Sequence, residues 1–165
     1  MTLMELRVSV VDAAATRELR RTVLRPSWPP GSAMHGDENA DAVHVAAYDG
    51  PELVGACLIL PRAYPLLPEE PDAWQLRGMA TAPDRQGQGI GGVLLTAAIA
   101  EVLRRRGRLI WCDARTSATR FYAQHGFSTA GAEFLHTESG IPHYRMWRRL
   151  DRGRPGPVRG RFPTG

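Results

Sequence analysis

The chain has 165 residues, 43% of them hydrophobic, which is enough for one domain with its own core. Its longest apolar stretches are far shorter than the roughly 20 residues that a membrane helix requires, so no membrane partner is expected. The formal charge of +4 gathers in residues 151–165, which hold four arginines and one aspartate, so the rest is nearly neutral and no nucleic-acid partner is expected.

The chain is predicted to form a folded domain over residues 1–150, followed by a disordered tail over residues 151–165. The tail is rich in Arg, Gly and Pro and has no hydrophobic period, so it cannot bury enough apolar surface to fold. The N-terminus lacks the basic and apolar regions of a secretory signal, which predicts a cytoplasmic protein. Cys57 and Cys112 are isolated, so neither a disulfide framework nor a metal site is expected.

The N-terminal third is predicted to hold one strand, one helix and a long loop. Apolar alternation from Leu6 predicts the strand, and residues 13–25 follow as an amphipathic helix. Its apolar face is formed by Ala15, Leu19 and Val23. The other faces carry Arg17, Arg20 and Arg21. Residues 26–42 are rich in Pro, Gly and acidic residues, which predicts a loop.

The middle of the chain begins with two strands, residues 43–48 and 52–60, joined by an Asp-Gly turn. A second proline-rich loop, residues 61–71, precedes a strand over residues 74–81 and a helix over residues 93–106. The acidic side chains in and beside these two loops are Asp37, Glu38, Asp41, Glu69, Glu70 and Asp72.

The last third is predicted to contain a strand over residues 108–113, a short helix over 117–125 closed by Gly126, and strands over 127–135 and 143–150. The whole order predicts a mixed α/β domain. Its sheet is mostly antiparallel and flanked by helices, and its centre is one strand, loop, helix and strand unit.

The glycine-rich segment Arg85 to Gly92 lies between a predicted strand and a predicted helix. Glycines there let the backbone approach a phosphate, and the free amides and dipole of the helix favour negative charge. A Walker loop is excluded because Val93, and not Lys, follows Gly92. The spacing also satisfies the dinucleotide fingerprint G-x-G-x-x-G. However, that fingerprint has its turn immediately after the strand, whereas here Ala82-Pro83-Asp84-Arg85 lies between the strand and the first glycine.

Two motifs resemble those of one enzyme family. Gln86-x-x-Gly89-x-Gly91 resembles the pyrophosphate motif Q/R-x-x-G-x-G/A of the GNAT superfamily of N-acetyltransferases, and residues 121–127 resemble the FY-x-x-x-GF that closes its core. Residues 138–143, with the sequence Glu-Ser-Gly-Ile-Pro-His, are similar to the E-D-G-I-P-H segment of its ElaA-like branch.

The resemblance implies the GNAT fold and an acyl-CoA-dependent N-acyltransferase. It implies transfer of an acetyl group from acetyl-CoA to a primary amine of a small molecule or peptide by direct attack. A regulatory domain that binds acyl-CoA without catalysis is the first alternative, and a dinucleotide-binding domain is the second. A homodimer is the candidate assembly.

In the fold that the resemblance implies, the loops over residues 26–42 and 61–71 flank the cleft, so they are expected to set specificity. Their acidic side chains are candidates for attracting a cationic amine.

The resemblance also assigns the residues that bind the cofactor. They are Met79, Ala80, Thr81, Gln86, Gly87, Gln88, Gly89, Ile90, Gly91, Gly92 and Arg115. Arg115 departs from the family, which usually has Asn at this position, or Gln in the ElaA-like branch. Asp113 stands where that branch often has Asn, and we expect Arg115 to pair with it.

Acyl transfer to an amine needs a proton donor for the thiolate and an acceptor for the amine proton. Tyr122 resembles the family tyrosine placed near the sulfur, and a phenol with an ordinary pKa of about 10 is a donor at neutral pH. The central strand offers Gln75 and Arg77 in place of the carboxylate that many relatives use as base. Glu138 and His143 of the closing segment are the candidate bases, and a water relay is an equal alternative.

Overall fold

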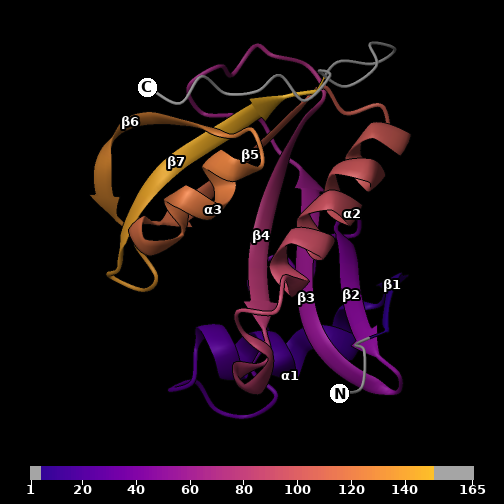
Figure 1. Ribbon diagram of the computed structural model, residues 1–165. Coiled ribbons are helices and arrows are strands. Elements are labelled where there is room, and N and C mark those ends of the chain that lie inside the picture. The colour runs from indigo at the N-terminus through magenta and orange to yellow at the C-terminus, as the bar shows by residue number, and fades with distance from the viewer. Residues whose placement is uncertain (1–4, 151–165) are drawn as a thin grey trace, which may run out of the picture.

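The computed structural model describes residues 5–150, which form a mixed α/β fold around a seven-stranded sheet (Figure 1). In chain order the helices, short 3-10 helices and strands are β1 (Leu6–Val11), α1 (Ala13–Leu24), β2 (Val43–Asp49), β3 (Glu52–Pro61), β4 (Ala73–Thr81), η1 (Pro83–Arg85), α2 (Ile90–Arg104), β5 (Leu109–Arg115), η2 (Thr116–Ala118), α3 (Thr119–Gln124), β6 (Ser128–Leu135) and β7 (Pro142–Arg149). The strand order is β1-β2-β3-β4-β5-β7-β6, and of the six adjacent pairs only β4 and β5 run parallel. This confirms the predicted fold class.

The predicted tail, residues 151–165, lies outside the described residues. Among residues 5–150, no helix combines the length and the hydropathy that crossing a bilayer would need.

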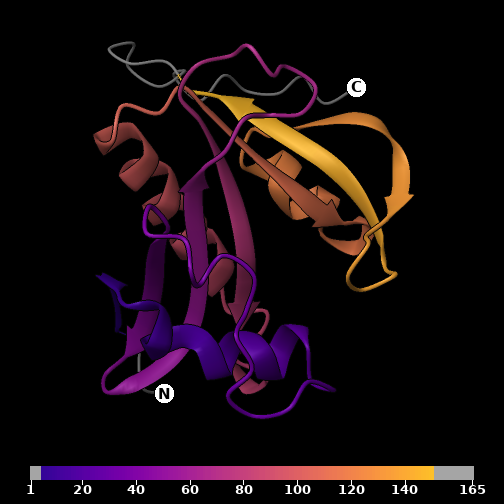
Figure 2. The same cartoon turned by 180° about the vertical axis from the view of Figure 1, so that it is seen from behind.

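The sheet carries helices on both faces. Helix α1 covers one face of β2, β3 and β4, and α2 covers the opposite face of the same strands, as Figures 1 and 2 show together. The main core lies between α2 and the sheet, where Leu94, Leu95 and Val102 are buried completely. Helix α2 lies so close to β3 that a Cβ on Gly55 would come within 2.7 Å of Ile90 Cγ2. A larger residue in place of this glycine would therefore push the helix off the sheet.

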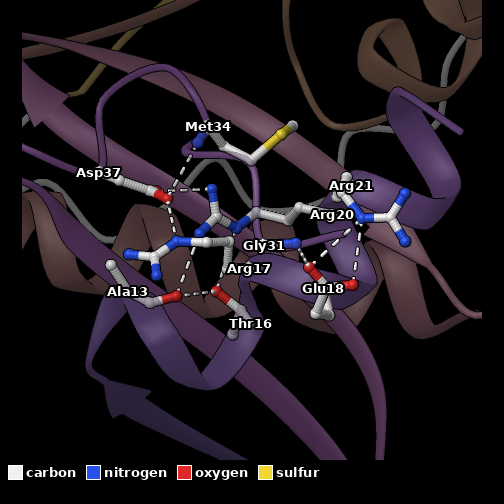
Figure 3. Close-up of polar contacts among 9 residues, drawn as sticks. All are labelled: Ala13, Thr16, Arg17, Glu18, Arg20, Arg21, Gly31, Met34 and Asp37. Atoms are coloured by element: carbon white, nitrogen blue, oxygen red, sulfur yellow. Dashed lines mark hydrogen bonds and ion pairs between the residues drawn. The ribbon is translucent and has the colours of Figure 1, made fainter. Parts of the chain in front are cut away.

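The predicted apolar face of α1 is wrong, because the helix buries Thr16, Arg20 and Arg21. Ala15 is exposed, and the other two residues of the predicted face are only half-buried. The reason is an ion pair that periodicity does not show: Asp37 of the 26–42 loop lies 2.8 Å from Arg20 (Figure 3). The loop supplies the countercharge that allows an arginine to point inward.

Helix α2 begins three residues earlier than predicted and ends two residues earlier. It begins early because Gly89, with φ of 83°, takes the left-handed conformation and turns the chain directly into the helix. It ends early because Arg106 takes a φ of 66° and the Gly107 amide then donates to Val102 O at 2.8 Å. The remaining predicted elements agree with the structure to within about two residues at each end.

Candidate active site

The site is a cleft that opens where β4 and β5 separate. The two strands pair only from Ala73–Leu109 to Gln75–Trp111 and then diverge, which Figure 1 shows as a V between β4 and the β5–β7 pair. A cavity of about 200 Å³ lies in the cleft. The side chains of its wall that carry polar or titratable groups are Arg25, Gln75, Arg77, Cys112, Asp113, Arg115, Tyr122, His136 and His143.

Strand β4 carries a bulge at the mouth of the cleft. Ala56 of β3 pairs with Ala80 and Leu58 pairs with Arg77, so β4 holds one extra residue between these pairs. Gly78 lies in the bulge with φ of 63°, and a Cβ there would come 3.3 Å from Arg20 Cδ. Because β5 has already diverged, the β4 backbone from residue 76 onward turns one edge toward the cleft, which suits the role predicted for Met79, Ala80 and Thr81.

The glycine-rich loop leads from the end of β4 into α2. Gly87 and Gly89 have φ of 79° and 83°, and a Cβ on either would meet no atom within 4 Å, so conformation and not space demands glycine there. No side chain between residues 5 and 150 caps α2, and the first amides of a helix have no partner within it. The amides of Ile90, Gly91 and Gly92 are therefore free to bind an anion.

Neighbouring residues fix the loop in place. Arg85 lies 2.7 Å from both Asp49 and Glu52 of the β2–β3 hairpin. Its charge is therefore neutralised by these two ion pairs, which attach the loop to the hairpin. Gln86 reaches back toward Thr81 O at 3.5 Å, while Gln88 is exposed. Residues of α3 cover the first turn of α2, because a Cβ on Gly91 would lie 3.4 Å from the Phe121 ring.

Tyr122 belongs both to the core and to the cavity wall. It is 6% exposed and packs against the rings of Phe121 at 5.0 Å and Phe127 at 5.5 Å. Burial raises the pKa of Tyr122 well above its usual value, and the nearby Cys112 thiol adds to the effect. The phenol therefore keeps its proton at neutral pH and can act as a donor.

Glu138 is held by cations and does not line the main cavity. Its carboxylate lies 3.2 Å from Arg25, 3.3 Å from His35 and 3.9 Å from Arg77. Burial raises the pKa of Glu138, but the Arg25 hydrogen bond and the nearby positive charges outweigh this and set it below the usual value. A carboxylate stabilised in this way is a weak base.

His143 lies on the cavity wall at the start of β7, where it is 7% exposed and pairs with Arg115 across the strands. Its Nδ1 is 2.7 Å from Ile141 O. A carbonyl oxygen only accepts, so in the neutral ring Nδ1 carries the proton and Nε2 carries the lone pair. His143 is thus fixed in the tautomer that can take up a proton at Nε2.

Sequence reasoning missed two residues of the wall and left a third without a role. His136 packs against His143 with ring centroids 4.7 Å apart, and burial together with that neighbour lowers its pKa. Arg25 enters from the end of α1 and Arg77 from β4. His136 and Arg25 lie outside any motif and approach the site only through the fold.

The expected pairing of Arg115 with Asp113 is wrong. Asp113 receives a hydrogen bond from Arg145 Nε at 2.9 Å, because β5 and β7 place these two residues directly opposite each other. Arg115 lies two residues further along the same strand and makes no ion pair with any residue between 5 and 150. Its charge remains available in the cavity.

The loops thought to set specificity contribute less than expected. No residue of the 61–71 loop lines the cavity, since that loop lies at the end of the sheet where β4 and β5 are still paired (Figure 1). Trp28, Met34 and His35 of the 26–42 loop line a smaller adjoining pocket. Two of the loop carboxylates that were expected to attract an amine are paired within the fold, Asp37 with Arg20 and Glu70 with Arg149.

Comparisons with known proteins agree with this geometry. Residues 13–127 match the sequence profile of the acetyltransferase (GNAT) family. The uncharacterized N-acetyltransferase YitI of Bacillus subtilis is 28% identical over 130 residues, which cover 78% of this chain and 87% of YitI.

Solved structures share the fold. ElaA of Escherichia coli has a TM-score of 0.67 at 16% identity, with 88% of this chain and 99% of ElaA covered. An aminoglycoside 6'-N-acetyltransferase complexed with coenzyme A has a TM-score of 0.66 at 21% identity, with 90% of this chain and 99% of that chain covered.

Proposed function

Because this chain belongs to the GNAT family of acetyltransferases, we propose that it transfers the acetyl group of acetyl-CoA directly to a primary amine of a small molecule or a peptide. One observation carries the proposal: Met79 of the free β4 edge, Tyr122 and His143 line one cavity, and Phe121 of the same wall lies against Gly91 at the open start of α2. An acyltransferase needs groups that hold the acyl donor and groups that move two protons, and these residues supply both.

The cofactor-binding residues divide between two tasks. The backbone of Met79, Ala80 and Thr81 would bind the extended arm of the donor along the β4 edge. The backbone from Gln86 to Gly92 would bind its pyrophosphate at the start of α2, where helix amides and the helix dipole favour anions. Acetyl-CoA supplies an activated thioester, and the chain supplies orientation and proton transfer.

Tyr122 and His143 would carry the two proton transfers. His143 accepts the amine proton at Nε2, while its Nδ1–H is held by Ile141 O. Tyr122 donates to the departing thiolate, and its burial keeps the phenol protonated until then. Glu138, whose pKa is lowered by its cationic neighbours, is assigned to substrate positioning in place of the base role.

The two alternatives from the sequence differ in what supports them. A dinucleotide-binding domain needs successive parallel βαβ units, and the sheet of residues 5–150 has one parallel pair, so this reading is wrong. A domain that binds acyl-CoA without catalysis shares every feature of the cleft and is separated only by turnover. The cytoplasmic location and the homodimer stay predictions.

The proposal is tested by incubating the protein with acetyl-CoA and a library of amines and measuring the release of the coenzyme A thiol. Replacing Tyr122 with Phe removes the donor hydroxyl and keeps the packed ring. We expect Tyr122→Phe to lower kcat by about 100-fold and to change the KM for acetyl-CoA by less than about threefold.

Tyr144→Phe is the matched control, because Tyr144 lies on β7 outside the cavity wall and its hydroxyl has no role in the proposal. It should keep full turnover. Unchanged turnover in Tyr122→Phe would remove Tyr122 from the mechanism. Stabilisation by acetyl-CoA against heat with no thiol release from any amine would favour the binding domain.

A further inference from the structure

The cavity is lined by more positive than negative charge. Arg25, Arg77 and Arg115 enter it from three different places in the fold, the residue after α1, β4 and β5. Among residues 5–150, Asp113 is the one carboxylate on the wall, and Arg145 pairs with it at 2.9 Å. A cationic acceptor would meet repulsion there, which contradicts the expectation drawn from the acidic loops.

Two of these arginines, Arg25 and Arg77, already form ion pairs with the Glu138 carboxylate. Glu138 places one oxygen 3.2 Å from Arg25 and the other 3.9 Å from Arg77, so a single carboxylate bridges two guanidinium groups. One negative charge between two positive charges leaves one cation without an equal partner. The bridge also shows that the space between the two guanidinium groups accepts a carboxylate.

Donor groups remain unused around this bridge. Arg25 donates to Leu24 O and to Glu138, but its Nε is buried and has no hydrogen-bond partner among residues 5–150. Arg77 has a side chain only 17% exposed, and burial lowers its pKa, which marks a cation that has lost much of its water. Buried donors of this kind gain most from an anion, because they no longer have full hydration to lose.

We propose that the acceptor is a primary amine that also carries a carboxylate, and that Arg77 and Arg25 bind this carboxylate while the amine faces His143 and Tyr122. All four side chains border the same cavity of about 200 Å³, so the amine and the carboxylate must lie close together, as in an α-amino acid. The inference rests on the proposed function, because it names the acceptor class of the same site.

The test compares the common amino acids as free acids with their carboxamides, and phenylalanine also with phenethylamine, which lacks the carboxyl group. The wild-type protein should prefer at least one free acid over its carboxamide after correction for the fraction of neutral amine. Arg77→Gln should raise the KM for that acid by about 10- to 100-fold and leave the carboxamide within about threefold. Arg77→Lys should recover part of the loss, because it restores the charge.

Arg108→Gln is the matched control, since Arg108 is an exposed arginine that lies outside the cavity wall. Arg108→Gln should leave the KM unchanged for both the acid and the carboxamide. Equal effects of Arg77→Gln on acids and carboxamides, or equal use of both by the wild type, would overturn the inference while thiol release still supported acetyl transfer.

A failure of the proposed function gives a different result. If no amine is acetylated, thermal shifts measured with coenzyme A present still compare each acid with its carboxamide. Stabilisation by an acid alone, lost in Arg77→Gln, would support the carboxylate site without turnover. Equal shifts for both compounds would overturn it.

Discussion

Two histidines share the cavity wall, and their hydrogen bonds give them different chemistry. His143 donates from Nδ1 to Ile141 O, which leaves a lone pair on Nε2. His136 accepts the Glu138 amide at Nδ1 over 3.4 Å, so its neutral ring carries the proton on Nε2. Only His143 is set up to receive a proton from an amine, although the rings lie side by side.

We therefore predict unequal effects of the same substitution. His143→Gln should lower kcat/KM by about 100-fold or more, because the amine then loses its proton to water. His136→Gln should lower it by less than about tenfold. The measurement is thiol release as a function of pH, in which His143→Gln should recover at high pH as the amine itself becomes neutral. Equal losses in both variants would point to a water relay across the pair.

The sequence predicts those site residues that belong to a short contiguous motif, and it misses those that reach the site only through contacts distant in the chain. Tyr122 and His143 belong to contiguous motifs, and both line the cavity, as the sequence predicts for two residues of the site. Arg25 and Glu138 meet across 113 positions in the chain, and a contact of that range leaves no local pattern. The Asp113–Arg145 pair escaped prediction in the same way, because it depends on the register of β5 with β7.

The elements show a similar division. The glycine loop indicated where α2 lies, and the left-handed Gly89 set its first residue. In α1 the hydrophobic period predicted the helix and its length correctly but chose the wrong face. The hydrophobic period reflects only the apolar side chains. The face that is buried depends on Asp37, because this residue of the following loop pairs with Arg20.

The start of α2 gives a prediction at this scale. Gly89→Ala puts a residue with a Cβ at a position of left-handed backbone conformation, which costs about 1–2 kcal/mol. The strain is located in the turn that orients the first amides of α2. We expect the dissociation constant for acetyl-CoA to rise by about tenfold, measured by calorimetry.

Gly131→Ala is a close control for strain. Gly131 lies in β6 with φ of 77°, and a Cβ there also meets no atom within 4 Å. It should lose similar stability and keep its affinity for acetyl-CoA. A similar loss of affinity in both variants would mean that the effect comes from stability and not from the loop.

At the scale of the whole molecule, the cleft depends on a connection between α1, the 26–42 loop and β4. Arg20 lies beneath the bulge at Gly78, and Asp37 holds Arg20 and Arg17 together at 2.8 and 2.9 Å (Figure 3). The Asp37 carboxylate also accepts the Met34 amide at 3.2 Å, which fixes the loop to the helix. The Asp37 side chain thus connects the 26–42 loop to α1, and through Arg20 it supports the β4 bulge that shapes the site.

We expect Asp37→Asn to lower the free energy of unfolding by about 3 kcal/mol at neutral pH, because it leaves Arg20 buried without its countercharge. Burial raises the pKa of Asp37, but the hydrogen bonds from Arg17 and Arg20 outweigh this and set it below the ordinary value of 3.8. A lowered carboxyl pKa stabilises the fold fully above that ordinary value, and the stabilisation is lost as the pH falls through the folded value. Urea unfolding at a series of pH values should therefore show the gap between wild type and Asp37→Asn constant near neutrality and closing in acid. Asp41→Asn, an exposed position in the same loop, should show no gap, and a gap that stayed constant into acid would mean that Asp37 acts by its shape and not its charge.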